Sequence, residues 1–137
     1  MKVFLDTNVV VDFIAKRENF YTEAERIVNL AENNFIEISI SSLTAINVAY
    51  VLRKKLSKTD VMSKLKSFIN LCDISAIDKQ IIIEAINADS YDFEDKVQQL
   101  SAVSADADII ITRDEKGFSD CEIPVFTPSE FVEKVQE

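Results

Sequence analysis

Four aspartates stand where a predicted strand meets the following helix or loop: Asp6 in FLDTN, Asp92 and Asp95 in DFED, and Asp114 in ITRD. They are spread over the whole chain, so only folding can bring them together. Carboxylates gathered at the ends of parallel strands repel one another and lose hydration, and a divalent cation usually neutralises such a cluster. The pattern therefore predicts a metal-dependent reaction on a charged substrate.

Several kinds of catalysis are excluded by what the sequence lacks. It has no histidine, which excludes the Ser-His-Asp triad, the HExxH zinc site and histidine-based acid–base catalysis. A P-loop or a GxGxxG dinucleotide loop needs several glycines, and the chain has only Gly117. Cys72 and Cys121 are isolated, and we interpret both as small buried apolar residues. Carboxylates, hydroxyls, amides, lysines and arginines remain for chemistry.

The 137 residues have an ordinary globular composition, 47% hydrophobic and 28% charged, which suits one domain over residues 1–137. The net charge of −9 opposes the basic surface that nucleic-acid-binding proteins usually carry, although bound cations change the local sign. Arg53, Lys54, Lys55 and Lys58 indicate either a solvated helix end or a patch that guides phosphates. Without a signal-peptide pattern or an apolar run near the ~20 residues of a membrane span, we expect a cytoplasmic protein with no membrane contact.

Apolar patterning places strands and helices in alternation along the chain. Strands are predicted at residues 2–5, 35–40, 73–77, 108–112 and 123–126. Helices are predicted after Asp6, at 21–32 with Thr22 as N-cap, from Ser41 or Ser42 to about 56, after a turn at 57–60 through Cys72, after Asp78, at 92–105 and from Pro128. Fully apolar central strands indicate a sheet covered on both faces. The predicted fold is α/β, with three layers and a mostly parallel sheet of four or five strands flanked by helices.

The functional edge of such a sheet lies beyond the carboxyl ends of its strands, where ligands bind. Asp6 ends the first strand and Asp114 follows the IIIT strand, so both belong to this edge. Each acid also has a structural explanation, because Asp6, Asp92 and Asp95 suit helix starts and Asp114 suits a surface turn. Glu94, in the DFED segment, is expected to project elsewhere.

Three segments in this order, LDTNV, DFEDxxQxxSA and IIITRD, resemble the PIN-domain family. The resemblance covers essentially the whole chain and is closest to small bacterial PIN domains of the VapC-toxin type. Each segment alone is a weak signal, whereas the three together in this order are fairly specific. The resemblance implies a parallel-sheet α/β fold, an acidic pocket for Mg²⁺ or Mn²⁺, and cleavage of RNA.

The resemblance also assigns roles to individual residues. The catalytic acids are Asp6, Asp95 and Asp114, and the metal ligands are these three together with Asp92. The supporting residues are Asn8, Asn47 and Thr112, and we expect Arg53, Lys54 and Arg113 as candidate RNA contacts. Toxin-type relatives further imply an antitoxin protein that blocks the site, and a homodimer.

The sequence departs from the family at Asn47, where the family typically has a glutamate. The helix around it is apolar nearly all round, so the amide is expected to be buried or to face a pocket. Asn47 then either belongs to the ligand sphere of a cation or makes a structural hydrogen bond to a neighbouring loop. One fewer carboxylate weakens metal binding, although some relatives that resemble this chain also carry asparagine here.

The expected reaction is hydrolysis of an RNA phosphodiester by water, because a divalent cation lowers the pKa of bound water from ~15.7 toward ~7–9. This route leaves a 5′-phosphate and does not require the RNA 2′-hydroxyl. The alternative is a catalytically weakened PIN-fold module that binds RNA or protein, which Asn47 and the net charge of −9 favour. A phospho-acceptor receiver domain needs an acidic pair after the first strand, and a haloacid-type phosphatase needs an aspartate at position 8; the sequence has neither.

Overall fold

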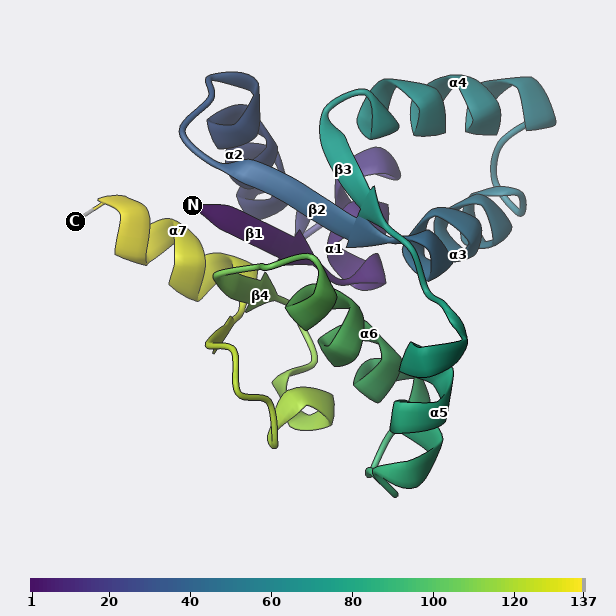
Figure 1. Cartoon of the computed structure of the whole chain (residues 1–137). Helices are drawn as coiled ribbons and strands as arrows, with labels where there is room; N and C mark the ends of the chain where they lie inside the picture. The colour runs from purple at the N-terminus through teal and green to yellow at the C-terminus, as the bar shows by residue number, and fades with distance from the viewer. Residues whose placement is uncertain (137) are drawn as a thin grey trace.

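The structure, a computed structural model, describes residues 1–136 (Figure 1). Five strands are formed in this part of the chain: β1 (Lys2–Leu5), β2 (Glu37–Ser41), β3 (Cys72–Ser75), β4 (Ile109–Ile111) and β5 (Val125–Phe126). The helices are α1 (Thr7–Ile14), α2 (Tyr21–Glu32), α3 (Ser42–Leu52), α4 (Lys58–Ile69), α5 (Lys79–Asn87), α6 (Phe93–Ser104), the 3-10 helix η1 (Glu115–Phe118) and α7 (Pro128–Gln136). None of the helices within residues 1–136 is long and apolar enough to cross a membrane.

The strands form one sheet in the order β3-β2-β1-β4-β5, with every neighbouring pair parallel. The parallel α/β fold predicted from the sequence is therefore confirmed. Leu5 pairs in register with Ile111, so the residues that follow them, Asp6 and Thr112, emerge side by side at the carboxyl edge. The register of two buried strands thus brings together two polar side chains 106 residues apart.

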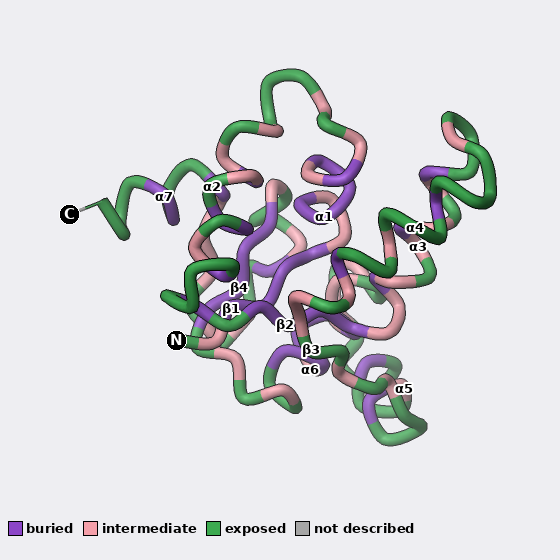
Figure 2. The backbone as a smooth tube through the Cα atoms, turned by 90° about the horizontal axis from the view of Figure 1, so that it is seen from above, coloured by how far each residue is buried: buried purple, intermediate pink, exposed green. Residues whose placement is uncertain are grey.

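Alternation along the strands supplies apolar side chains to both faces of the sheet. Val3 and Leu5 belong to a large core shared with α1, α2, α3 and α7, whereas Phe4 belongs to a smaller core with α6 and η1. Figure 1 shows α6 on one side of the sheet and α1 and α2 on the other. In Figure 2 the buried backbone follows β1, β2 and β4, whereas the α3–α4 hairpin extends from the body of the molecule. Helices on both faces make the predicted three layers.

Several boundaries differ from the prediction. The third helix ends at Leu52 and not near 56, and Ser57 then caps α4 by accepting a hydrogen bond from the Asp60 amide. Cys72, expected in a helix, begins β3 and pairs with Ile38.

Two further local predictions about the second helix and the segment after β4 also need correction. Phe20, and not Thr22, occupies the N-cap position of α2, and no side chain caps this helix. The segment expected as a polar loop after β4 contains the short helix η1, which packs Phe118 into the smaller core.

Candidate functional site

Asp6 is fixed at the carboxyl edge by four hydrogen bonds. Its Oδ1 accepts from the Thr7 amide at 2.8 Å and from Gln98 Nε2 at 3.0 Å. Its Oδ2 accepts from Thr112 Oγ1 at 2.8 Å and from Asn8 Nδ2 at 3.4 Å. Only 6% of Asp6 is exposed, and all four donors are uncharged. The carboxylate is therefore oriented by the protein without being neutralised by it.

Gln98 links three elements beneath the acidic edge, a role that was not predicted. Its Nε2 donates to Asp6 and also to Thr44 Oγ1 at 2.8 Å, while its Oε1 accepts from Ser41 Oγ at 2.5 Å. Ser41 is the N-cap of α3, so α6, α3 and the end of β1 share one buried network. The partners lie 54 to 92 residues away, and the available signal was the glutamine of the DFEDxxQxxSA segment, which is Gln98.

The DFED segment combines helix capping with an uncompensated acid. Asp92 is the N-cap of α6, and its Oδ1 accepts from the Asp95 amide at 3.0 Å. Asp95 Oδ2 is buried and has no hydrogen-bond partner among the described residues. This oxygen lies against Gly117 of η1, where a Cβ atom would overlap the Asp95 carboxylate. Any side chain at position 117 would therefore displace the Asp95 carboxylate, a role of the only glycine that sequence reasoning missed.

The environment of Asp95 penalises its negative charge. Burial, followed by the nearby charges of Asp6, Asp92, Asp114 and Glu94, raises the pKa of Asp95 from 3.8 to about 7. An added positive charge would favour the ionised form.

A cleft of about 320 Å³ joins these acids at the carboxyl edge of the sheet. Its lining includes Asp6, Asn8, Arg17, Asp92, Glu94, Asp95 and Asp114. Glu94 was expected to project elsewhere and instead lines the cleft. Five carboxylates and an amide are the hard oxygen ligands that Mg²⁺ and Mn²⁺ accept, and the unpartnered Asp95 oxygen fits that chemistry. As the side chains stand in residues 1–136, no three acids converge closely enough to enclose an ion.

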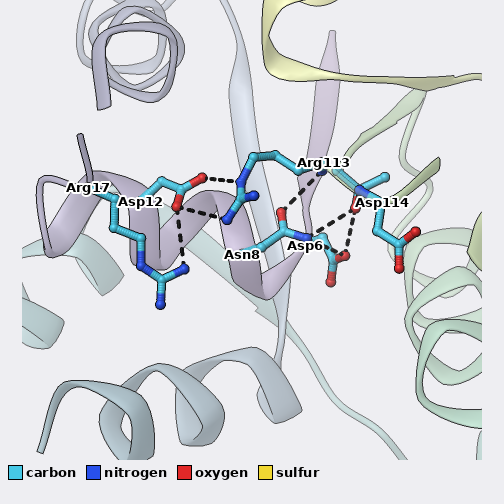
Figure 3. Close-up of polar contacts among 7 residues, drawn as sticks. Asp6, Asn8, Asp12, Arg17, Arg113 and Asp114 are labelled. Atoms are coloured by element: carbon cyan, nitrogen blue, oxygen red, sulfur yellow. Dashed lines mark hydrogen bonds and ion pairs between the residues drawn. The ribbon is translucent and has the colours of Figure 1, made fainter. Parts of the chain in front are cut away.

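Arg113 points away from the acids of the cleft and forms an ion pair with Asp12, which lies outside the cleft lining (Figure 3). Its Nε and Nη2 donate to the Asp12 carboxylate at 2.6 and 3.2 Å, and its guanidinium lies 3.9 Å from the centre of the Phe20 ring. Arg17 approaches the same carboxylate at 3.6 Å. Asp12 is only 1% exposed, and sequence reasoning missed it. The signal was a lone acid within the apolar helix TNVVVDFI, which needs a partner when buried.

The remaining predicted site residues occupy the rim or the exterior. Asp114 is exposed, and its amide donates to Thr112 Oγ1 at 3.0 Å. Asn47 is half-buried on α3 and lies outside the cleft lining, but its Nδ2 donates to Oε1 of Glu94, a residue of that lining, at 3.1 Å. Arg53 and Lys54 are exposed beyond the end of α3, where the Arg53 guanidinium stacks 3.9 Å from the Tyr50 ring centre. The structure thus brings the four predicted aspartates to one cleft and leaves the three predicted RNA contacts outside its lining.

Comparisons with known proteins bear on the family and the fold of this chain. A family model described as the PIN domain matches residues 2–116. Ribonuclease VapC1 of Aquifex aeolicus is 31% identical over 139 residues, covering 97% of this chain and 94% of the relative. DNA-bound VapBC from Salmonella typhimurium is similar in structure, with a TM-score of 0.69 at 20% identity, over 93% of this chain and 98% of that one.

A second solved structure gives the same result for the fold. VapC20 of Mycobacterium tuberculosis, a toxin that cleaves the sarcin–ricin loop, has a TM-score of 0.68 at 10% identity, over 86% of this chain and 94% of that one. At such low identities the two structures establish the fold alone. The family match and the 31% identical relative go further, and the chain belongs to the PIN-domain family.

Proposed function

We propose that this protein is a divalent-metal-dependent endoribonuclease that hydrolyses RNA phosphodiester bonds. The observation that carries the proposal is the gathering of five carboxylates in one cleft, in a chain 31% identical to a protein named as a ribonuclease. A histidine-free chain has no imidazole for acid–base catalysis. Carboxylates around a cation are the chemistry that remains.

The cation of this proposal is Mg²⁺ or Mn²⁺, held by Asp6, Asp92, Asp95 and Asp114. When bound, such an ion lowers the pKa of a coordinated water and stabilises negative charge on the phosphate. The unpartnered Asp95 oxygen and the mutual repulsion of the acids support this assignment. Because the side chains stand apart, their carboxylates would have to rotate to hold the ion.

Neighbouring residues orient one acid of the cleft, and another acid holds a proton. Thr112, Asn8 and Gln98 fix the Asp6 carboxylate through its two oxygens. The Asp95 carboxyl, with its pKa raised to about 7, carries a proton in part of the molecules near neutral pH. It releases that proton when positive charge enters the cleft.

Arg17 supplies the contact that we propose for an RNA phosphate. It is the only basic side chain that lines the cleft among the described residues. Its 3.6 Å contact with Asp12 is looser than the 2.6 Å contact made by Arg113, so Asp12 stays paired if Arg17 turns to a substrate. Arg53 and Lys54, beyond the end of α3, then contact RNA farther from the reacting bond.

The test is cleavage of a panel of single-stranded RNA and tRNA in Mg²⁺, Mn²⁺ or EDTA, with Asp6→Asn beside the wild type. We expect metal-dependent cleavage that leaves a 5′-phosphate and is absent from the variant. A 2′,3′-cyclic phosphate product would refute direct hydrolysis by water. Equal cleavage by Asp6→Asn would remove the cleft from the reaction.

We also propose a protein partner. The similar structures include a DNA-bound VapBC complex from Salmonella typhimurium and a toxin–antitoxin complex from Klebsiella pneumoniae, which supports an antitoxin as the partner. We propose in addition that the antitoxin covers the site and that the protein acts in the cytoplasm as a homodimer. Size-exclusion chromatography with light scattering tests the dimer.

The second candidate function is a catalytically weakened RNA- or protein-binding module, which the uncharged Asn47 favours. A large gain of cleavage in Asn47→Glu would support it.

A further inference from the structure

The side chain of Glu94 is held by a residue of another helix. It lies in the first turn of α6 and lines the acidic cleft. Asn47 Nδ2, on α3, donates to Glu94 Oε1 at 3.1 Å. An exposed glutamate otherwise samples many rotamers, and fixing them costs up to about 2 kcal/mol of conformational entropy. The contact with Asn47 therefore restricts Glu94 to the side that faces the cleft.

Glu94 shares the lining of the cleft with the four predicted aspartates, so its charge adds to theirs in one small space. Holding a fifth carboxylate near Asp6, Asp92 and Asp114 is unfavourable unless something positive compensates it. A helix N-terminus accounts for part of this placement, because an acid in the first turn gains about 0.3–1 kcal/mol from the helix dipole. That gain does not depend on the amide of α3.

The chemistry of the two side chains is complementary. An amide at position 47 brings no charge, but it donates a hydrogen bond that a carboxylate at that position cannot donate. The place where family resemblance puts an acid thus holds a donor, and the acid comes from α6 instead. Resting on the metal-dependent function proposed above, we infer that Glu94 is an acid of the cation site and that Asn47 is the positioning residue that holds it there.

Manganese affinity tests this inference without any cleavage assay. Mn²⁺ is titrated calorimetrically into the metal-stripped full chain, and thermal unfolding checks that each variant is folded. Glu94→Gln keeps the size and the hydrogen-bond acceptor but removes the charge, and we expect about 10-fold weaker binding. Asn47→Ala leaves the charge but removes one hydrogen bond that holds the Glu94 side chain, and we expect about 3-fold weaker binding, below the effect of losing the acid itself.

An exchange of the two residues sharpens the test. In Asn47→Glu combined with Glu94→Gln, the acid moves to α3 and the amide to α6, so affinity should return to within about 3-fold of wild type. The matched control is Glu133→Gln, an exposed acid on α7, which should bind Mn²⁺ like the wild type. An exchange variant as weak as Glu94→Gln would overturn the pairing of the two positions.

Asp6→Asn separates failure of this inference from failure of the proposed function. If wild type binds Mn²⁺, Asp6→Asn does not, and Glu94→Gln binds like wild type, Glu94 is not part of the site and only the inference falls. If the wild type itself binds no Mn²⁺, the metal-dependent function falls and the inference with it.

Discussion

Two buried aspartates near α1 have opposite surroundings. Asp12, 1% exposed, is paired with the guanidinium groups of Arg113 and Arg17. Asp6, 6% exposed, receives only uncharged donors and faces Asp95, whose Oδ2 has no partner among the described residues. The first carboxylate is neutralised by the protein itself. The second group keeps an uncompensated negative charge at the edge where ligands bind to parallel sheets.

One short segment serves both regions. After β4, Thr112 donates to Asp6, Arg113 pairs with Asp12, and Asp114 enters the cleft lining. Figure 3 shows Arg113 extended toward Asp12 and Asp114 pointing away from that pair. The arginine most easily interpreted as an RNA contact is thus used to stabilise the fold. Burial of an acid alone does not indicate function; burial without a cationic partner does.

Removing the acid of the neutralised region should give the largest loss of stability. In Asp12→Asn the Arg113 guanidinium loses its charged partner, and breaking a buried pair costs about 3 kcal/mol. Urea unfolding measures the change, with the exposed Asp73→Asn as a matched control. A variant within about 0.5 kcal/mol of wild type, the size of ordinary surface changes, would mean that Asp12 is not the structural acid.

Crowding the uncompensated region should have the next largest effect. In Gly117→Ala the new Cβ meets the Asp95 carboxylate, and overpacking of this kind costs about 1–3 kcal/mol. The displaced Asp95 should also bind Mn²⁺ more weakly in a calorimetric titration. Lys116→Ala, one residue earlier on the exposed side of η1, is the control. Unchanged stability and affinity in Gly117→Ala would refute the close packing of Asp95.

The pH dependence of stability should distinguish the two regions. The folded pKa of Asp95, about 7, lies above its ordinary value of 3.8, so the folded state binds this proton more tightly. Stability is then lost as the pH rises from about 4 through about 7. Asp95→Asn removes this loss and should be more stable than wild type by about 1–2 kcal/mol near pH 8, after allowance for solvent screening, but not near pH 4.

Urea unfolding in EDTA at the two pH values measures this difference. A difference between Asp95→Asn and wild type that does not change with pH would contradict the raised pKa. Asp12→Asn, the matching variant in the neutralised region, should not gain stability at high pH, because Asp12 has cationic partners at every pH in this range.

The smallest effect is expected from the hydroxyl that orients Asp6. Thr112→Val removes a 2.8 Å hydrogen bond to the Asp6 carboxylate and the acceptor of the Asp114 amide, at a cost of about 1 kcal/mol. Cleavage kinetics and urea unfolding measure the change. Thr112→Ser keeps the hydroxyl and serves as control. A Thr112→Val enzyme with wild-type rate and stability would show that Asp6 needs no orientation.

Local patterns in the sequence predicted most of the fold. DIIIT and VFL are apolar runs of strand length, and Asp6, Asp78 and Asp92 mark helix starts that the structure also has. The carboxyl edge followed from the parallel sheet. This placed Asp6 and Asp114 together without any knowledge of contacts.

Long-range partners could not be read in the same way. The Asp12–Arg113 pair joins residues 101 apart, and the Gln98–Asp6 contact spans 92 residues. Such pairs depend on strand register and helix rotation, which periodicity fixes only approximately. The role of Gly117 was hidden for the same reason, because its clash is with Asp95 on another element.

The cleavage rate of one labelled single-stranded RNA by wild type and Asp95→Asn, in Mn²⁺ and in EDTA, tests most directly whether the uncompensated acids form the active site. We predict that wild type cleaves the RNA in Mn²⁺ and that EDTA abolishes this cleavage. Asp95→Asn should cleave more than about 100-fold more slowly, because losing a metal ligand costs more than the roughly 10- to 100-fold lost with a residue that only orients a ligand. Undiminished cleavage by Asp95→Asn, or by wild type in EDTA, would contradict it.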